Sequence, residues 1–201
     1  TSLSERSSGK SNHARKSFSR REAKVTVSEY LAEFVAGTDC DAIPGEVIAK
    51  AKTCILDTLG CALLGTRSPW RGILDSYLPA PGGSEEARVI GLPIKTSAQN
   101  AAFANGILSH VDDLDDIVWS IGHPSVAVLP ATLALAEREN VSGKEFLLAF
   151  VLGFEVACHL SRHTNPAHFR KGWHSTATIG IFGAAAGGAR ILKLDRERTG
   201  W

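Results

Sequence analysis

The sequence lacks several features that mark large classes of proteins. Its four cysteines include no Cys-x-x-Cys pair, the spacing that zinc and redox sites use. They are therefore expected to be buried thiols in a reducing compartment, not disulfides. No apolar run reaches the roughly 18–20 residues that a membrane-spanning helix needs. Because 22 lysines and arginines balance 21 aspartates and glutamates, the net charge of +1 gives no general attraction to nucleic acid or membranes.

Several catalytic and nucleotide-binding motifs are also missing. The sequence contains no Gly-x-Ser-x-Gly and no His-Glu-x-x-His, which argues against acyl transfer and against a metal site. The glycine-rich stretch near Gly180 follows no predicted strand, which argues against nucleotide binding. We therefore expect a cytoplasmic protein, or a mitochondrial matrix protein if the source is eukaryotic. It should bind a small molecule, with no cofactor, no metal, no nucleic acid and no membrane.

Residues 1–24 differ in composition from the rest of the chain. They carry seven lysines and arginines against two glutamates, and their only large apolar residues are Leu3 and Phe18. Such a segment cannot bury enough apolar surface to fold, so we expect a disordered basic arm rich in serine and arginine. It lacks the apolar stretch of a secretory signal. A transit peptide and an arm that contacts nucleic acid are the alternatives that the composition leaves open.

From residue 25 to residue 201, apolar residues recur three and four positions apart, which predicts an all-α domain. The expected helix starts are Ser28, Pro44, Ser68, Thr96 or Ser97, Pro124, Lys144 and Ile179. At most a short β element is expected near residues 88–95. Another helix begins near Arg196, so we expect the helical domain to continue beyond Trp201.

The segment His110–Ser125, HVDDLDDIVWSIGHPS, stands out between two of these apolar helices. It places four aspartates between His110 and His123, namely Asp112, Asp113, Asp115 and Asp116. Crowded carboxylates repel one another unless they are solvated, paired or used in chemistry. The segment is therefore either a solvated loop or a functional site. A metal held by these side chains is a third reading, which no known ligand spacing supports.

A second group of polar residues lies between residues 165 and 178. His174, like His123, precedes a predicted helix, where backbone N–H groups and the helix dipole favour anions. Histidine can give or take a proton near neutral pH. Arg170 and Lys171 lie close to His174 and could hold a carboxylate, although flanking surface charges are more often only solvated. Together these residues indicate proton transfer on a small polyanionic acid.

Five motifs follow one another along the chain. They are ILDTLGCALLGT at Ile55–Thr66, HVDDLDD at His110–Asp116, GHPSVAVLPA at Gly122–Ala131, GFEV at Gly153–Val156 and GWHSTAT at Gly172–Thr178. In this order they resemble the MmgE/PrpD family, which includes 2-methylcitrate dehydratase, cis-aconitate decarboxylase and iminodisuccinate epimerase. The resemblance implies the N-terminal part of a large helical domain, a small α/β domain beyond the chain end, and a homodimer.

By position, the resemblance implies that Asp113, His123 and His174 are catalytic. The family's active-site lysine and tyrosine would lie beyond Trp201, so we expect this stretch alone to be inactive. The chain departs from the family at one point. Decarboxylase-like members tend to have a threonine or tyrosine and a histidine just after the acidic motif, where this chain has Ile117–Trp119.

The expected function is that of a metal-free hydro-lyase for a small polycarboxylic acid, similar to 2-methylcitrate dehydratase of propionate catabolism. One of His123 and His174 would remove a proton next to a carboxylate, and the other would protonate the departing hydroxyl. Asp113 would orient or tune a histidine, and Arg170 or Lys171 would hold a carboxylate. The alternatives are cis-aconitate decarboxylation, iminodisuccinate epimerisation, and a non-catalytic helical module that dimerises.

Overall fold

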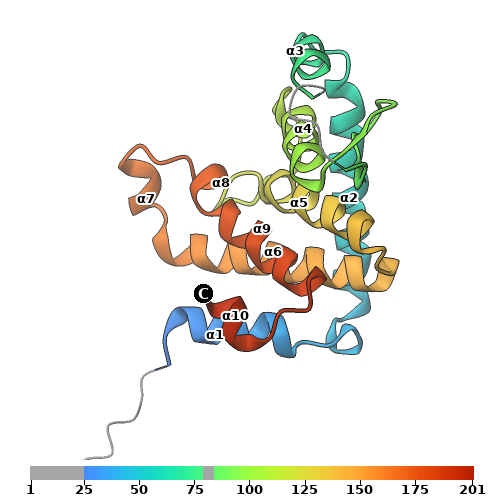
Figure 1. The fold of residues 1–201 in the computed structure, drawn as a ribbon. Helices are drawn as coiled ribbons and strands as arrows, with labels where there is room; N and C mark the ends of the chain where they lie inside the picture. The colour runs from blue at the N-terminus through green and yellow to red at the C-terminus, as the bar shows by residue number, and fades with distance from the viewer. Residues whose placement is uncertain (1–24, 79–83) are drawn as a thin grey trace, which may run out of the picture.

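The computed structural model describes residues 25–78 and 84–201, and these residues are mainly helical (Figure 1). The helices are α1 (Val27–Gly37), the 3-10 helix η1 (Cys40–Ala42), α2 (Gly45–Gly65), α3 (Trp70–Tyr77), α4 (Ala98–His110), α5 (Pro124–Glu139), α6 (Gly143–Thr164), α7 (Ala167–Arg170), α8 (Ser175–Thr178), α9 (Gly180–Ile191) and α10 (Arg196–Gly200). Strands β1 (Ala87–Arg88) and β2 (Lys95–Thr96) pair antiparallel. The all-α prediction with one short β element is confirmed. The predicted disordered arm, residues 1–24, lies outside the described residues.

Side-chain capping marks the starts of α1, α4, α6 and α10, and the cap of α1 was placed wrongly from the sequence. The cap of α1 is Thr26 and not Ser28, because the Thr26 hydroxyl accepts a hydrogen bond from the Glu29 N–H while the Glu29 carboxylate accepts one from the Thr26 N–H. Ser142 and Glu145 form the same reciprocal cap at α6. Such a pair satisfies N–H groups that the first turn of a helix leaves without partners.

Helices α5, α6 and α9 form the centre of the fold (Figure 1). Their closeness depends on residues without side chains, because a Cβ atom on Gly153 of α6 would lie 2.6 Å from the Gly183 carbonyl oxygen of α9. A Cβ atom on Gly187 would lie 2.4 Å from a methyl carbon of Thr132 in α5. The glycine-rich helix thus lets its neighbours approach closely, as its composition predicts.

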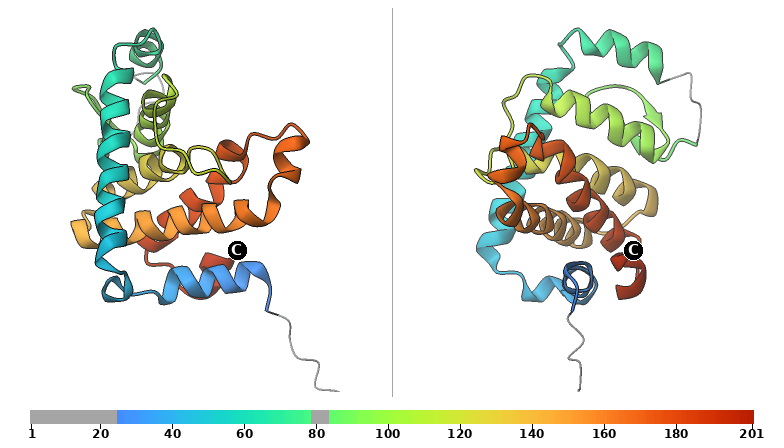
Figure 2. Two further views of the ribbon diagram at one scale, coloured as in Figure 1. Left: turned by 180° about the vertical axis from the view of Figure 1, so that it is seen from behind. Right: turned by 90° about the vertical axis from the view of Figure 1, so that its left-hand side faces the viewer.

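Helix α2 extends along one side of the molecule from the level of α1 to the level of α3 (Figure 2). Its inner face contributes Ala51 and Cys54 to an apolar cluster with Leu129 of α5 and Phe150 of α6. Nearer its end, Ala62 packs with buried side chains of α3 and α4. Helix α4 also packs on α5, and the C-terminal end of α4 lies close to the N-terminal end of α5, since the rings of His110 and His123 are 4.7 Å apart.

None of the helices in residues 25–78 and 84–201 combines the length and the apolar character that crossing a membrane would require.

Candidate active site

The acidic segment forms a loop from the end of α4, at His110, to the start of α5, at Pro124. The loop turns back on itself where Val118 and Gly122 exchange backbone hydrogen bonds. It is anchored to α6 because Ser161 and Asn165 both donate hydrogen bonds to the Ser120 carbonyl oxygen. The loop therefore has a defined course and does not behave as a freely solvated connection.

A second anchor joins the loop to α8. The backbone N–H of His123 donates to the Thr176 hydroxyl at 3.1 Å. Gly122, with φ of +91°, leaves the room for this contact, because a Cβ atom there would lie 2.7 Å from the same hydroxyl oxygen. Two separate stretches, the acidic loop and the segment that begins α8, are thus held against each other.

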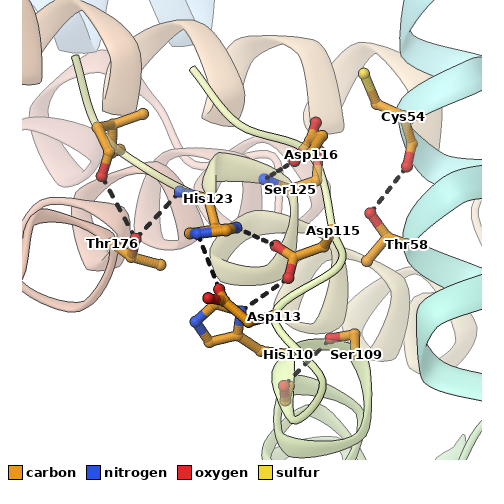
Figure 3. Close-up of polar contacts among 12 residues, drawn as sticks. Cys54, Thr58, Ser109, His110, Asp113, Asp115, Asp116, His123, Ser125 and Thr176 are labelled. Carbon is orange, nitrogen blue, oxygen red and sulfur yellow. Dashed lines mark hydrogen bonds and ion pairs between the residues drawn. The ribbon is translucent and has the colours of Figure 1, made fainter. Parts of the chain in front are cut away.

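Asp115 is the buried centre of the cluster (Figure 3). One of its carboxylate oxygens, Oδ1, lies 2.8 Å from Nδ1 of His110, and the other, Oδ2, lies 3.0 Å from Nδ1 of His123. The Asp115 side chain has no solvent exposure, whereas those of His110 and His123 are 32% and 13% exposed. A buried carboxylate is tolerated when it is paired in this way.

Asp113 reaches the same histidine from the solvent side. Its carboxylate Oδ1 lies 3.2 Å from Nε2 of His123, and its side chain is 76% exposed. The backbone at Asp113 is left-handed, with φ of +54°, a conformation that aspartate tolerates better than most residues. The structure therefore brings together Asp113 and His123, two of the three side chains predicted to be catalytic. Their catalytic roles stay a prediction.

His174, the third predicted catalytic residue, lies at the start of α8. Its ring is stacked on that of His110, with the ring centroids 6.5 Å apart and the planes 18° apart. The His110 ring is in turn 4.7 Å from that of His123, again between centroids. His110 thus lies between the two histidines that the family resemblance singles out.

Arg170 and Lys171, the predicted carboxylate-binding residues, are exposed at the end of α7. In the part of the chain that the structure describes, neither side chain makes an ion pair or hydrogen bond with His123, His174 or Asp113. The structure does not join them to the histidine cluster, and their contact with substrate stays a prediction.

The N-terminal end of α5 already has an anionic partner, the carboxylate of Asp116 in the loop. His123 makes no side-chain capping bond, and Asp116 takes that role by accepting hydrogen bonds from the Ser125 hydroxyl at 2.6 Å and the Ser125 N–H at 3.3 Å. A carboxylate near a helix N-terminus is favoured by the exposed N–H groups and the dipole. Part of the anion-binding capacity expected beside His123 is thus taken up by Asp116.

The buried cysteines are not suited to nucleophilic catalysis. Burial, with a smaller contribution from the nearby Asp116 carboxylate, raises the pKa of Cys54 to about 11. Burial likewise raises the pKa of Cys158 to about 12. Both side chains are therefore neutral thiols near pH 7, and the thiolate is the reactive form.

Four side chains of the cluster could also contact a metal ion. His110, Asp113, Asp115 and His123 each offer one ligand atom within 4.8 Å of the others. Both Asp115 oxygens and both Nδ1 atoms are engaged with one another, so a cation would have to replace these hydrogen bonds. The same donors and acceptors could serve acid–base chemistry without a cation. That the site needs no metal remains a prediction.

Comparison with known protein families shows which family the chain belongs to. Residues 29–201 match the MmgE/PrpD N-terminal domain. The chain belongs to the MmgE/PrpD family. Both sequence stretches that form the cluster, the acidic loop and the start of α8, lie inside the matched region of the MmgE/PrpD domain.

The chain is similar to proteins named cis-aconitate decarboxylase. It is 34% identical over 179 residues to that of Homo sapiens, which covers 86% of the chain and 37% of the human protein. It is 32% identical over 182 residues to that of Aspergillus terreus, covering 86% and 36%. It is also 32% identical over 186 residues to the cis-aconitate decarboxylase-like protein oryM of Aspergillus oryzae, covering 86% and 38%. The chain thus spans little more than a third of these MmgE/PrpD relatives.

Sequence reasoning placed His110 and Asp115 in the acidic segment but did not assign a catalytic role to either of these two residues, which complete the cluster. His110 and Asp115 stand in the acidic motif, but the family resemblance singled out Asp113 in the same run. The available signal was the pair of histidines that bracket the aspartates, because two imidazoles near one carboxylate are a common way to satisfy it. Which aspartate is buried depends on the course of the loop.

Proposed function

We propose that the full-length protein is a metal-free lyase that acts on a small polycarboxylic acid. The observation that carries the proposal is the placement of His123 between Asp113 and Asp115, with His174 on the same cluster. Two imidazoles held in one site can remove a proton at one point of a substrate and deliver a proton at another. The family membership and the names of the relatives support a lyase.

Decarboxylation of cis-aconitate or a close analogue is the reaction that the relatives favour. The carbon–carbon bond to the leaving carboxylate breaks, carbon dioxide departs, and the electron pair remains on the carbon skeleton. A proton from His123 or His174 then completes the product. Asp113 would hold the His123 ring in place, and Arg170 or Lys171 would hold a remaining carboxylate.

Dehydration of 2-methylcitrate is the second candidate, and the segment after the acidic motif favours it. Ile117 and Trp119 stand where decarboxylase-like relatives tend to have residues that can form hydrogen bonds. The Ile117 side chain is 69% exposed and that of Trp119 is fully exposed. In dehydration, one histidine removes a proton from carbon, and the other protonates the hydroxyl, which leaves as water.

The test is proton NMR of the full-length protein with cis-aconitate, 2-methylcitrate, citrate and iminodisuccinate in deuterated buffer, with and without chelator. New vinyl signals from cis-aconitate that survive the chelator would support the decarboxylase. A dehydrated product of 2-methylcitrate would support the second candidate. Deuterium entering iminodisuccinate without net product would show an epimerase instead. No reaction by a folded protein with any of them would contradict the lyase and favour a module that only dimerises.

The chelator arm is also the test of the metal-free prediction. We expect turnover to stay within roughly twofold of its starting value after dialysis against chelator, because acid–base catalysis uses only the imidazoles and carboxylates. Loss of turnover that added divalent cation restores would instead assign a metal to the four side chains of the cluster.

A further inference from the structure

Asp115 has the environment of a residue with a specific task. Its side chain is fully buried, whereas Asp113 and Leu114 just before it are exposed. Each of its two oxygens contacts a different histidine and the two distances are nearly equal, 2.8 Å to His110 and 3.0 Å to His123. Burial of a carboxylate carries a large desolvation cost, which these two contacts offset. Hydrogen-bonding chemistry then fixes what the contacts mean for the two rings.

An ionised carboxylate can only accept hydrogen bonds, so Nδ1 of each histidine must carry the hydrogen. The remaining nitrogen of each ring, Nε2, is then the one available for proton transfer. Figure 3 shows both Nε2 atoms on the side of the rings away from Asp115. Nε2 of His123 faces the Asp113 carboxylate at 3.2 Å, and the His110 ring is nearly parallel to the His174 ring, with the centroids 6.5 Å apart. Asp115 thus keeps a hydrogen on Nδ1 of both rings at once, and Nε2 of His123 donates to the Asp113 carboxylate when that ring is protonated.

We propose that Asp115 is a positioning residue for two histidines, and that His110 is a third proton-transfer group of the site. The His110 ring is 4.7 Å from that of His123 and 6.5 Å from that of His174, so one substrate can contact all three. When Nε2 of His110 accepts a proton from the substrate, the resulting imidazolium is stabilised by the Asp115 carboxylate. The same proton returns to substrate or solvent before the next turnover, so the ring is unchanged overall.

The tautomers can be measured without any substrate. Two-bond proton–nitrogen NMR spectra of protein labelled with ¹⁵N-histidine distinguish a hydrogen on Nδ1 from one on Nε2. His110→Gln and His123→Gln assign the signals. We expect the hydrogen on Nδ1 in both rings of the wild-type protein. A hydrogen on Nε2 and a bare Nδ1 in either neutral ring would overturn the positioning role.

The Asp115→Asn variant makes the tautomer test sharper. The amide offers one acceptor oxygen and one donor nitrogen in place of two acceptor oxygens. One histidine can keep its Nδ1 hydrogen, while the other must present a bare Nδ1 to the amide and carry its hydrogen on Nε2. We expect one of the two rings to change tautomer. Two unchanged rings in a folded Asp115→Asn protein would overturn the inference.

Kinetics test the role of His110, and this arm rests on the proposed function. We expect Asp115→Asn to lower kcat by about 10²-fold or more with a much smaller change in KM, because a wrong tautomer impairs proton transfer more than binding. We expect His110→Gln to lower kcat by about 10-fold or more while the His123 ring keeps its tautomer. Asp112→Asn, at an exposed aspartate of the same segment, is the control and should leave kcat within about twofold.

Wild-type kcat in His110→Gln would overturn the catalytic role of His110, and wild-type kcat in Asp115→Asn would overturn the positioning role. A wild-type protein that turns over none of the four acids would contradict the proposed function only. The NMR spectra would then still decide whether Asp115 fixes both rings.

Discussion

His123 is held at three points, and this explains why the candidate site depends on it. Its Nδ1 contacts the buried Asp115, its Nε2 contacts the exposed Asp113, and its backbone N–H donates to Thr176. The backbone contact does not involve the ring. A change of the side chain should therefore affect the chemistry more than the attachment of the loop to α8.

Replacement of His123 by glutamine tests this directly. We expect His123→Gln to lower kcat by about 10²–10⁴-fold, the usual contribution of a positioned acid or base, while the circular dichroism spectrum stays that of the wild type. The matched control is His163→Gln, because His163 is an exposed histidine near the end of α6 whose Nδ1 contacts a backbone carbonyl. Wild-type turnover in a folded His123→Gln protein would contradict the assignment.

At the residue scale, sequence motifs predicted part of the histidine–carboxylate cluster. The spacing within the family motifs identified Asp113 and His123, and the structure places their side chains 3.2 Å apart. The motif spacing did not identify Asp115, because local hydropathy predicts a buried Leu114 and an exposed Asp115, and the structure shows the reverse. Over all atoms of each residue, Leu114 is 64% exposed and its neighbour Asp115 only 3%. That reversal follows from contacts with His110 and His123 that form only when the loop is folded.

At the scale of the elements, Gly122 controls how the loop meets α8. Replacement by alanine adds left-handed backbone strain and a Cβ atom 2.7 Å from the Thr176 hydroxyl oxygen. We expect Gly122→Ala to lower the free energy of unfolding by ~1–3 kcal/mol and to lower kcat, because the clash displaces His123. Urea denaturation and steady-state kinetics measure the two effects.

Gly172 provides the matched control for this prediction. Its φ is +88°, close to that of Gly122, but a Cβ atom there would meet no atom within 4 Å. Gly172→Ala therefore carries the backbone strain without the clash. We expect it to be less destabilising than Gly122→Ala and to spare kcat. Equal losses of stability and kcat in the two variants would mean that strain alone, and not the contact with Thr176, determines the outcome.

The packing of α6 against α9 gives a second prediction at this scale. A Cβ atom on Gly183 would lie 2.6 Å from the Gly153 carbonyl oxygen and 2.8 Å from Cβ of Ala157. We expect Gly183→Ala to lower the free energy of unfolding by ~1–3 kcal/mol, since overpacking outweighs the better helix propensity of alanine.

Gly60, in the middle of α2, isolates the propensity effect because a Cβ atom there meets nothing within 4 Å. Gly60→Ala should leave stability unchanged or raise it by up to ~1 kcal/mol. Stabilisation by both alanines, measured by urea denaturation, would show that α6 and α9 can move apart at no cost.

The contact between Gly153 and Gly183 also shows how much of the helix packing the sequence could predict. Apolar spacing predicted the helices, and the small residues of α9 predicted a close approach of its neighbours. The sequence could not tell that Gly153 and Gly183 face each other, because such a pairing depends on how two helices far apart in the chain pack. The start of α1 was placed at Ser28 for a related reason, since several nearby residues can cap a helix and only the Thr26–Glu29 pair forms both bonds.

At the scale of the whole molecule, the described helices leave many large apolar side chains exposed. On α3 and α4 these include Trp70, Ile73, Tyr77 and Phe103, with the rings of Tyr77 and Phe103 5.6 Å apart. Exposed apolar patches of this kind usually contact other protein. The chain spans just over a third of its human relative, so additional residues of a longer chain and a second copy are both able to cover such surfaces.

The family resemblance predicts a homodimer, and a test of this prediction shows whether a second copy or the rest of the same chain covers the α3–α4 surface. We expect the full-length protein to sediment at twice its chain mass at micromolar concentration, because burial of apolar surface between copies favours association. Phe103→Glu would then shift the protein towards the monomer if the α3–α4 surface belongs to the dimer interface. In that case helicity should be retained, since Phe103 is 53% exposed within the chain. If Phe103→Glu leaves the dimer intact but lowers the free energy of unfolding, this surface is instead covered by other residues of the same full-length chain. A monomeric wild-type protein at these concentrations would contradict the dimer itself.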